Sequence, residues 1–166
     1  MPSLLFTPLQ LRSVTFKNRI GVAPMCQYSC RDGLASHWHL VHLGSRAVGG
    51  AGMVMVEASA VSAAGRISPA DLGIWSDAHA AALAPIAQFI AEQGAAPAIQ
   101  LAHAGRKGST QVPWQGRQAV PPAEGGWAVR APSAVAFNEV YPMPAEMTES
   151  DIARVVDDFA AAAQRS

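Results

Sequence analysis

The chain has 166 residues; half of them are hydrophobic and only 14% are charged, against roughly 25% in an average soluble domain. Its 12 basic and 12 acidic residues give a formal net charge of zero, with no basic run, so we expect neither nucleic acid nor a membrane surface as a partner. No apolar stretch reaches the roughly 20 residues of a membrane span, and neither a signal-peptide layout nor a disulfide framework is present. We therefore expect a cytoplasmic protein with free thiols.

The first 50 residues predict a hairpin followed by a strand and a helix. Residues 9–11 and 14–16 flank a two-residue turn, which is typical of a short β-hairpin. Residues 20–23 are apolar and end at a proline, and we interpret them as a first buried strand. Ser36 is a suitable N-cap for the next helix, which should end at the glycine pair 49–50.

A second strand and helix follow. Residues 53–56 are continuously apolar, as in a parallel strand that is covered on both faces. Asp77 is a plausible N-cap for a helix with Leu83, Ile86 and Ile90 on one face. Because Pro85 removes a backbone hydrogen bond, this helix should bend there or begin later.

The last part of the chain predicts a strand, a long loop and a helix. Residues 96–101 form the third expected strand, and the loop runs from about His103 to Met147. Thr148 should cap the final helix, whose apolar stripe consists of Ile152, Val155, Val156 and Phe159.

This order of elements predicts an α/β fold, the N-terminal part of a (βα)8 TIM barrel preceded by a short β-hairpin. We expect a single incomplete barrel domain, with the hairpin at about 1–19 and the first three βα units at about 20–166. A complete barrel has eight strands and typically ~250 residues, so the chain should stop before the barrel closes. A doubly wound sheet is the other parallel arrangement, but the sequence has no G-x-G-x-x-G turn.

In βα folds, catalytic residues lie at the C-terminal ends of the strands. That rule selects Cys26 and Tyr28, then Ala58, then Gln100 with His103. These groups suit the binding of a flat polar ring better than hydrolysis. His37, His39 and His42 have a spacing that resembles a metal site, although we expect them to pack at the helix start. Glu57 needs a partner if it is buried, and the sequence does not name one.

Several motifs in register resemble the Old Yellow Enzyme family of flavin ene-reductases. Residues 18–28 (NRIGVAPMCQY) resemble the family's first-strand motif, and the pair Cys26 and Tyr28 resembles its thermophilic-like, bacterial branch. The later motifs follow in the family's order: 57–61 (EASAV), 65–67 (GRI), 72–77 (LGIWSD), 100–107 (QLAHAGRK), 131–134 (APSA) and the helix start at 147–148.

The resemblance implies FMN as cofactor, NADPH or NADH as reductant, and an α,β-unsaturated carbonyl compound as the small-molecule substrate. It assigns Ala23, Pro24, Met25 and Cys26 to the flavin ring, with Cys26 tuning the flavin's reduction potential. Tyr28 would contact substrate, Ala58 would touch the ring, and Gln100 would hydrogen-bond the ring's pyrimidine edge. The hydride transfer itself belongs to the flavin.

The family's substrate-binding His-x-x-His or His-x-x-Asn pair, its flavin-contacting arginine and its phosphate site come from later strands. We therefore keep two expectations: an enzyme in the context of a complete barrel, and a non-catalytic truncated fragment or half-barrel that cannot turn over alone. Missing strands would leave an open sheet edge and apolar faces, so association through that edge, or a homo-oligomer, is expected. A different FMN barrel, of the dihydroorotate- or glycolate-oxidase type, predicts other strand-end motifs.

Overall fold

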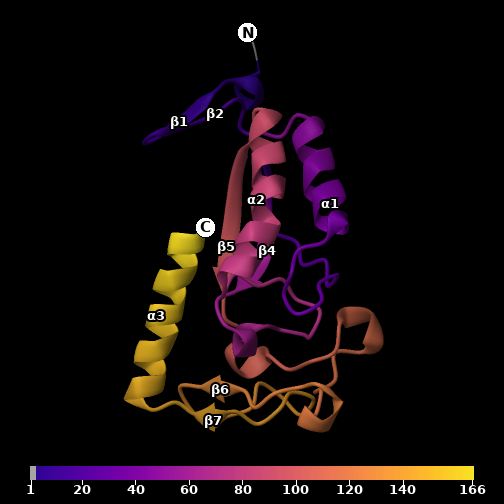
Figure 1. Ribbon diagram of the computed structural model, residues 1–166, viewed down its shortest axis with the longest axis vertical. Coiled ribbons are helices and arrows are strands. Elements are labelled where there is room, and N and C mark those ends of the chain that lie inside the picture. The colour runs from indigo at the N-terminus through magenta and orange to yellow at the C-terminus, as the bar shows by residue number, and fades with distance from the viewer. Residues whose placement is uncertain (1–2) are drawn as a thin grey trace.

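A small parallel sheet lies at the centre of the computed structural model, which describes residues 3–166 (Figure 1). The sheet contains β3 (Gly21–Val22), β4 (Met53–Ala60) and β5 (Ala96–Ala102), in the order β3-β4-β5. Both strand pairs are parallel, with Gly21 opposite Met53 and Met53 opposite Ala96. The sequence predicted all three strands, although β3 is shorter than residues 20–23.

An antiparallel hairpin of β1 (Leu9–Leu11) and β2 (Val14–Phe16) precedes the sheet, at the residues that the sequence predicts. The hairpin lies at the end of the molecule opposite the long loop (Figure 1). The segment after it is anchored to the ends of the two following helices: Lys17 Nζ donates to Gln93 O at 2.8 Å, and Asn18 Nδ2 donates to Gly50 O at 2.8 Å.

Two helices, α1 (His37–Val48) and α2 (Asp77–Glu92), cover one face of the sheet and pack against each other. Ser36 is the N-cap of α1, as expected. The expected N-cap of α2 is wrong by one residue, because Ser76 has the extended backbone of a cap and Asp77 is already helical. The alternative of a later start is also wrong, since α2 contains Pro85 in its interior.

The hydrophobic core lies between this helix pair and the sheet. Val54 and Val56 of β4 meet Leu43 of α1 and Ile86 and Ile90 of α2, and all five are buried. The loop after β4 adds Leu72 and Ile74, which are almost fully buried. Burial of such side chains contributes roughly 1.5–3 kcal/mol each relative to exposure, so this layer stabilises most of the fold.

The long loop after β5 contains short 3-10 turns and one two-residue pair of parallel strands, β6 (Arg130–Ala131) and β7 (Ala145–Glu146). It leads into α3 (Glu149–Arg165), which Thr148 caps as expected by accepting from Asp151 N. Helix α3 lies beside β5 (Figure 1). Of its expected apolar stripe, Ile152 and Val156 are exposed, and Phe159 packs at the core.

No helix in residues 3–166 combines the length and the apolar character that crossing a membrane requires.

Candidate active site

The C-terminal ends of the three parallel strands bring together the residues that the sequence selected. Ala58 of β4 lies opposite Gln100 of β5, and residues 23–26 continue directly from β3. The Cys26 thiol lies near the Ala58 backbone and the Tyr28 side chain, and both groups act on its pKa. Four predicted side chains from three chain segments therefore form one wall.

A β-bulge in β4 determines which side chains reach this wall. Val56 pairs with Ile99 and Ala58 with Gln100, so Glu57 is an extra residue between two regular pairs. Before the bulge the half-buried residues are Met53 and Met55; after it the half-buried residue is Ala58. The alternation thus shifts by one position, which puts Ala58 on the wall and buries Glu57.

Gln27 fixes the segment between Cys26 and Tyr28. Its backbone N–H donates to Glu57 Oε2 at 3.0 Å, and its side-chain Oε1 accepts from Trp38 Nε1 at 3.0 Å. Tyr28 itself has a φ of 49°, a left-handed conformation that non-glycine residues seldom adopt. These contacts hold Cys26 and Tyr28 on the same side of the strand ends.

Both hydrogen-bonding groups of this segment stay protonated at neutral pH. Burial, followed by the negative charges of Asp71 and Glu57, raises the pKa of Cys26. Burial and the neighbouring Cys26 raise the pKa of Tyr28. The wall therefore presents a thiol and a phenol as hydrogen-bond donors, with no thiolate nucleophile.

The wall is open to solvent. Ala23, Met25 and Gln100 are exposed, and Pro24, Cys26 and Ala58 are half-buried. Because Gln100 is exposed, its amide is free to hydrogen-bond with a ligand. Small side chains beside a free amide suit a flat ring that stacks on the strand ends and hydrogen-bonds at its edge.

A cavity of about 400 Å³ adjoins the wall at Tyr28. Tyr28 and His103 face it from the strand-end side, and Thr110, Gln111 and Tyr141 face it from the long loop. The Tyr28 ring also meets Trp114 edge to face, with centroids 5.7 Å apart. The long loop thus encloses a space next to Tyr28 that is large enough for a small molecule.

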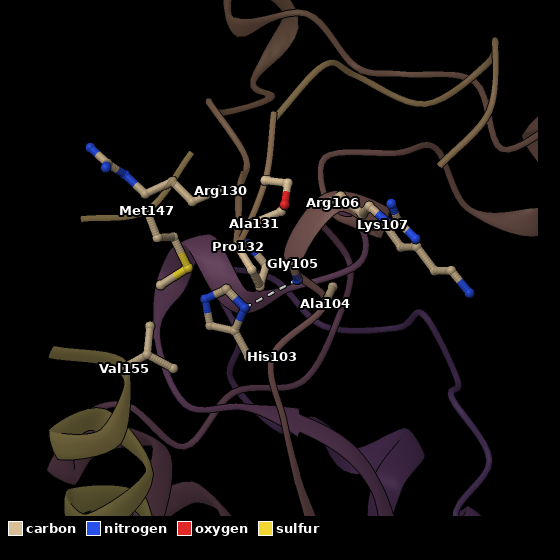
Figure 2. Close-up of a pocket in the computed structure, with 11 residues that line it drawn as sticks. His103, Ala104, Gly105, Arg106, Lys107, Arg130, Ala131, Pro132, Met147 and Val155 are labelled. Atoms are coloured by element: carbon tan, nitrogen blue, oxygen red, sulfur yellow. Dashed lines mark hydrogen bonds between the residues drawn. The ribbon is translucent and has the colours of Figure 1, made fainter. Parts of the chain in front are cut away.

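A second cavity, of about 510 Å³, lies between the end of β5, the β6–β7 pair and α3 (Figure 2). Figure 2 shows the His103 ring turned toward Met147 and Val155, and Gly105 N donates to His103 Nδ1 at 3.1 Å. Lys107 and Arg130 extend away from this ring in opposite directions. The cavity is therefore mostly apolar, and it shares only His103, Ala104 and Lys107 with the cavity beside Tyr28.

Sequence reasoning missed the partners of Glu57. The structure provides the Gln27 N–H and the ring of His39, whose Nε2 lies 3.9 Å from Glu57 Oε2. His39 is fully buried, and its Nδ1 accepts from Ser36 N as part of the helix cap, which agrees with the expected packing at the helix start. The sequence did show that Glu57 is a charged residue at the end of an apolar run, which indicates that it needs a partner, but it does not show which residues supply one.

Comparison with known proteins places the whole chain in one family of sequences. Residues 4–166 match the sequence model of the NADH:flavin oxidoreductase / NADH oxidase family. An NADPH dehydrogenase from a Geobacillus species is 45% identical over the full chain, which spans 45% of that protein. An NADH:flavin oxidoreductase from Gibberella zeae is 47% identical over 97% of the chain, which spans 40% of that protein. The chain thus spans less than half the length of these relatives.

Solved structures agree. The old yellow enzyme homologue from Zymomonas mobilis superposes with a TM-score of 0.81 and 29% identity, over 98% of this chain and 45% of that one. Morphinone reductase in complex with tetrahydroNAD gives a TM-score of 0.80 at 29% identity, over 97% of this chain and 45% of that one. The expected fold, the N-terminal part of the barrel of this family, is confirmed.

Proposed function

Because the chain belongs to the NADH:flavin oxidoreductase / NADH oxidase family, we propose that it forms the flavin-binding wall of an FMN-dependent ene-reductase. That membership confirms, for the family, the expectation of a flavin cofactor and a nicotinamide reductant. The observation that carries the proposal is the convergence of Cys26, Tyr28, Ala58 and Gln100 at the ends of β3, β4 and β5. When bound, FMN supplies the hydride that reduces an activated C=C bond.

Each residue of the wall has a defined part in this proposal. Ala23, Pro24 and Met25 follow directly after β3 and offer backbone groups and small or flexible side chains for the ring to lie on. Gln100 presents both an amide donor and an acceptor to the edge of the ring. Ala58 is small enough to let the ring approach the strand.

Cys26 and Tyr28 act through hydrogen bonds. The neutral Cys26 thiol lies beside the proposed ring position, where a thiolate would disfavour a reduced, anionic flavin, so its protonation tunes the reduction potential. The Tyr28 hydroxyl lines the cavity beside the wall and can donate to the carbonyl oxygen of an enone held there. NADPH or NADH would use the same open face.

Titration of the protein with FMN, followed by flavin fluorescence, tests the proposal. Replacing Gln100 by Ala should weaken binding about 3- to 10-fold, the cost of roughly one net hydrogen bond. Gln88→Ala, which removes an amide on the exposed side of α2, is the matched control and should leave binding unchanged. A protein that does not bind FMN, or equal effects of the two variants, would contradict the proposal.

The edge of the sheet supports an alternative, in which the chain alone is a non-catalytic part of a larger assembly. Among residues 3–166, β5 pairs with a strand on one side only, and α3 exposes Ile152 and Val156. We infer that these 166 residues alone do not turn over and associate through the edge of β5, in a homo-oligomer or with further barrel strands. NADPH oxidation with an added enone, measured together with the solution mass, decides between the two functions: turnover by a monomer contradicts the second.

A further inference from the structure

Three potential metal ligands from separate elements meet on the side of β4 opposite the proposed flavin wall. They are Cys30 from the loop after β3, His39 from the first turn of α1, and Glu57 from the bulge of β4. Cys30 Sγ lies 3.4 Å from His39 Nε2, which lies 3.9 Å from Glu57 Oε2. All three ligand atoms lie within 4.8 Å of one another.

The Glu57 carboxylate is incompletely satisfied. Its Oε2 accepts from Gln27 N at 3.0 Å, but its buried Oε1 has no hydrogen-bond partner in the part of the chain that the structure describes. The residue is only 3% exposed. A buried carboxylate oxygen without a partner is unfavourable, and a cation bound at Oε2 offsets this by neutralising the charge that both oxygens share.

The separations fit a tetrahedral ion. Zinc bound to a sulfur at about 2.3 Å and to a nitrogen at about 2.0 Å holds those atoms about 3.5 Å apart, close to the observed 3.4 Å between Cys30 Sγ and His39 Nε2. The nitrogen–oxygen separation for such an ion is about 3.4 Å and the sulfur–oxygen separation about 3.6 Å. The observed values are 3.9 Å for Nε2 to Oε2 and within 4.8 Å for the set of ligand atoms, so Glu57 moves toward the other two ligands when the ion binds. Thiolate, imidazole and carboxylate together favour a borderline cation such as Zn²⁺ over Mg²⁺ or Ca²⁺.

Ser36 can set the tautomer that a metal requires. Its Oγ lies 3.1 Å from His39 Nδ1 and can accept a hydrogen bond from a protonated Nδ1, which leaves the Nε2 lone pair free toward Cys30 and Glu57. In the metal-free protein His39 Nδ1 accepts a hydrogen bond from the N–H of Ser36, and that hydrogen bond is lost when the metal binds. Hydrogen bonding of the second histidine nitrogen is the usual support of a histidine metal ligand.

Charge also favours a cation here. Burial raises the pKa of Glu57 to about 7 and that of Cys30 to about 12, and Asp71 adds negative potential at both groups. A divalent ion balances one thiolate and one carboxylate, so a buried cluster that is costly to ionise alone becomes neutral as a complex. Cys30 is half-buried, which leaves an entry path for the ion.

We propose that Cys30, His39 and Glu57 bind one Zn²⁺ ion, with a fourth position open to water. Binding displaces the thiol proton of Cys30, and any proton on Glu57, to solvent; the ion gains Sγ, Nε2 and Oε2 as ligands in place of hydration water. The ligands lie on the other side of β4 from Ala58, and Glu57 Oε2 also accepts from Gln27 N, so the site is linked to the flavin wall only through this backbone contact.

Titration of the metal-free protein with Co²⁺, a spectroscopic substitute for Zn²⁺, tests the site. We expect a near-ultraviolet thiolate-to-cobalt charge-transfer band that saturates at one ion per chain and is removed by Zn²⁺. Cys30→Ser should abolish the band. The matched control, Cys26→Ser, should retain it, because Cys26 lies outside the cluster. Absence of the band, or its survival in Cys30→Ser, would overturn the proposal.

A second measurement uses the unaltered chain, so its result does not depend on whether a variant folds. Zn²⁺ should slow maleimide alkylation of Cys30 by at least tenfold relative to chelator, as resolved by peptide mass spectrometry, while alkylation of Cys26 keeps its rate. Ser36→Ala should weaken Zn²⁺ binding about 10-fold, within the range for loss of a supporting hydrogen bond. Equal protection of the two cysteines, or protection of neither, would contradict a site at Cys30.

Discussion

The shared hydrophobic core is built almost entirely from residues 20–102, whereas residues 103–166 add little to it and many of their apolar side chains point outward. In the first region Val54, Leu72 and Ile90 are fully buried between the sheet and the helix pair. In the second region the long loop is held by turns and hydrogen bonds, and Val156 of α3 is 62% exposed. The two regions are therefore stabilised differently. Burial of apolar side chains stabilises the first region, whereas hydrogen bonds to backbone groups and close local packing stabilise the second.

The largest effect should come from the core. Ile90→Ala removes a fully buried side chain and leaves a cavity, so it should lower the free energy of unfolding by about 4 kcal/mol. Val156→Ala is the control from α3 and should change it by less than about 0.5 kcal/mol. Denaturant unfolding measures both. Similar losses of stability for the two variants would show that α3 is buried in solution, and would contradict the difference in burial between the two regions.

Close packing within the long loop should produce the next largest effect. A Cβ at Gly126 would lie 1.8 Å from Val120 O and 2.7 Å from Ser109 Oγ, so Gly126→Ala should cost about 3 kcal/mol. The neighbouring Gly125 has a φ of 90° and open space around its Cβ position, so Gly125→Ala should cost only about 1 kcal/mol of backbone strain. Thermal unfolding distinguishes them, and equal shifts would mean that the loop is loosely packed.

The buried carboxyl of Glu57 should give a pH-dependent effect in metal-free protein. Its pKa is raised from 4.5 to about 7, so the folded state holds this proton more tightly and loses stability as pH rises between those values. Glu57→Gln cannot ionise, and its stability relative to the original protein should rise by about 3 kcal/mol across that window. Unfolding in chelator at pH 4.5 and pH 8 measures this; a difference independent of pH would contradict it.

The smallest effect concerns the start of α3. The Thr148 side chain accepts from Asp151 N at 3.2 Å, and Thr148→Ala should cost about 1 kcal/mol through loss of this cap. Ser150→Ala, two residues later, is the control and should cost less. If helical circular dichroism and unfolding show no difference between the variants, the order of α3 depends on packing after all.

Local patterns predicted much of the fold. The apolar run at 53–56 and the apolar period of α2 locate those elements, although β4 continues beyond 56 to Ala60. The caps at Ser36 and Thr148 were predictable because cap chemistry is local. At the start of α2 two adjacent residues are both good caps, and local sequence could not choose Ser76 over Asp77. The β6–β7 pair was missed because two-residue strands have no period to detect.

The strand ends of the site were predictable because the ends of parallel strands share one edge of the sheet. The Cys30–His39–Glu57 cluster was not, because it depends on a register shift between β4 and β5 that no local pattern encodes. The sequence showed Glu57 as a buried charge in need of a partner. Only the bulge determines that this partner is the ring of His39.

The extra residue in β4 is the one position of this strand that the pairing with β5 does not use. A substitution at Glu57 changes one side chain. Deleting Glu57 would join Val56 directly to Ala58, restore regular pairing with Ile99 and Gln100, and leave Ala58, Ser59 and Ala60 on the faces that they occupy now. Random mutagenesis that includes single-codon deletions should therefore find that loss of codon 57 preserves the strand pairing and removes only the contacts of the Glu57 carboxylate.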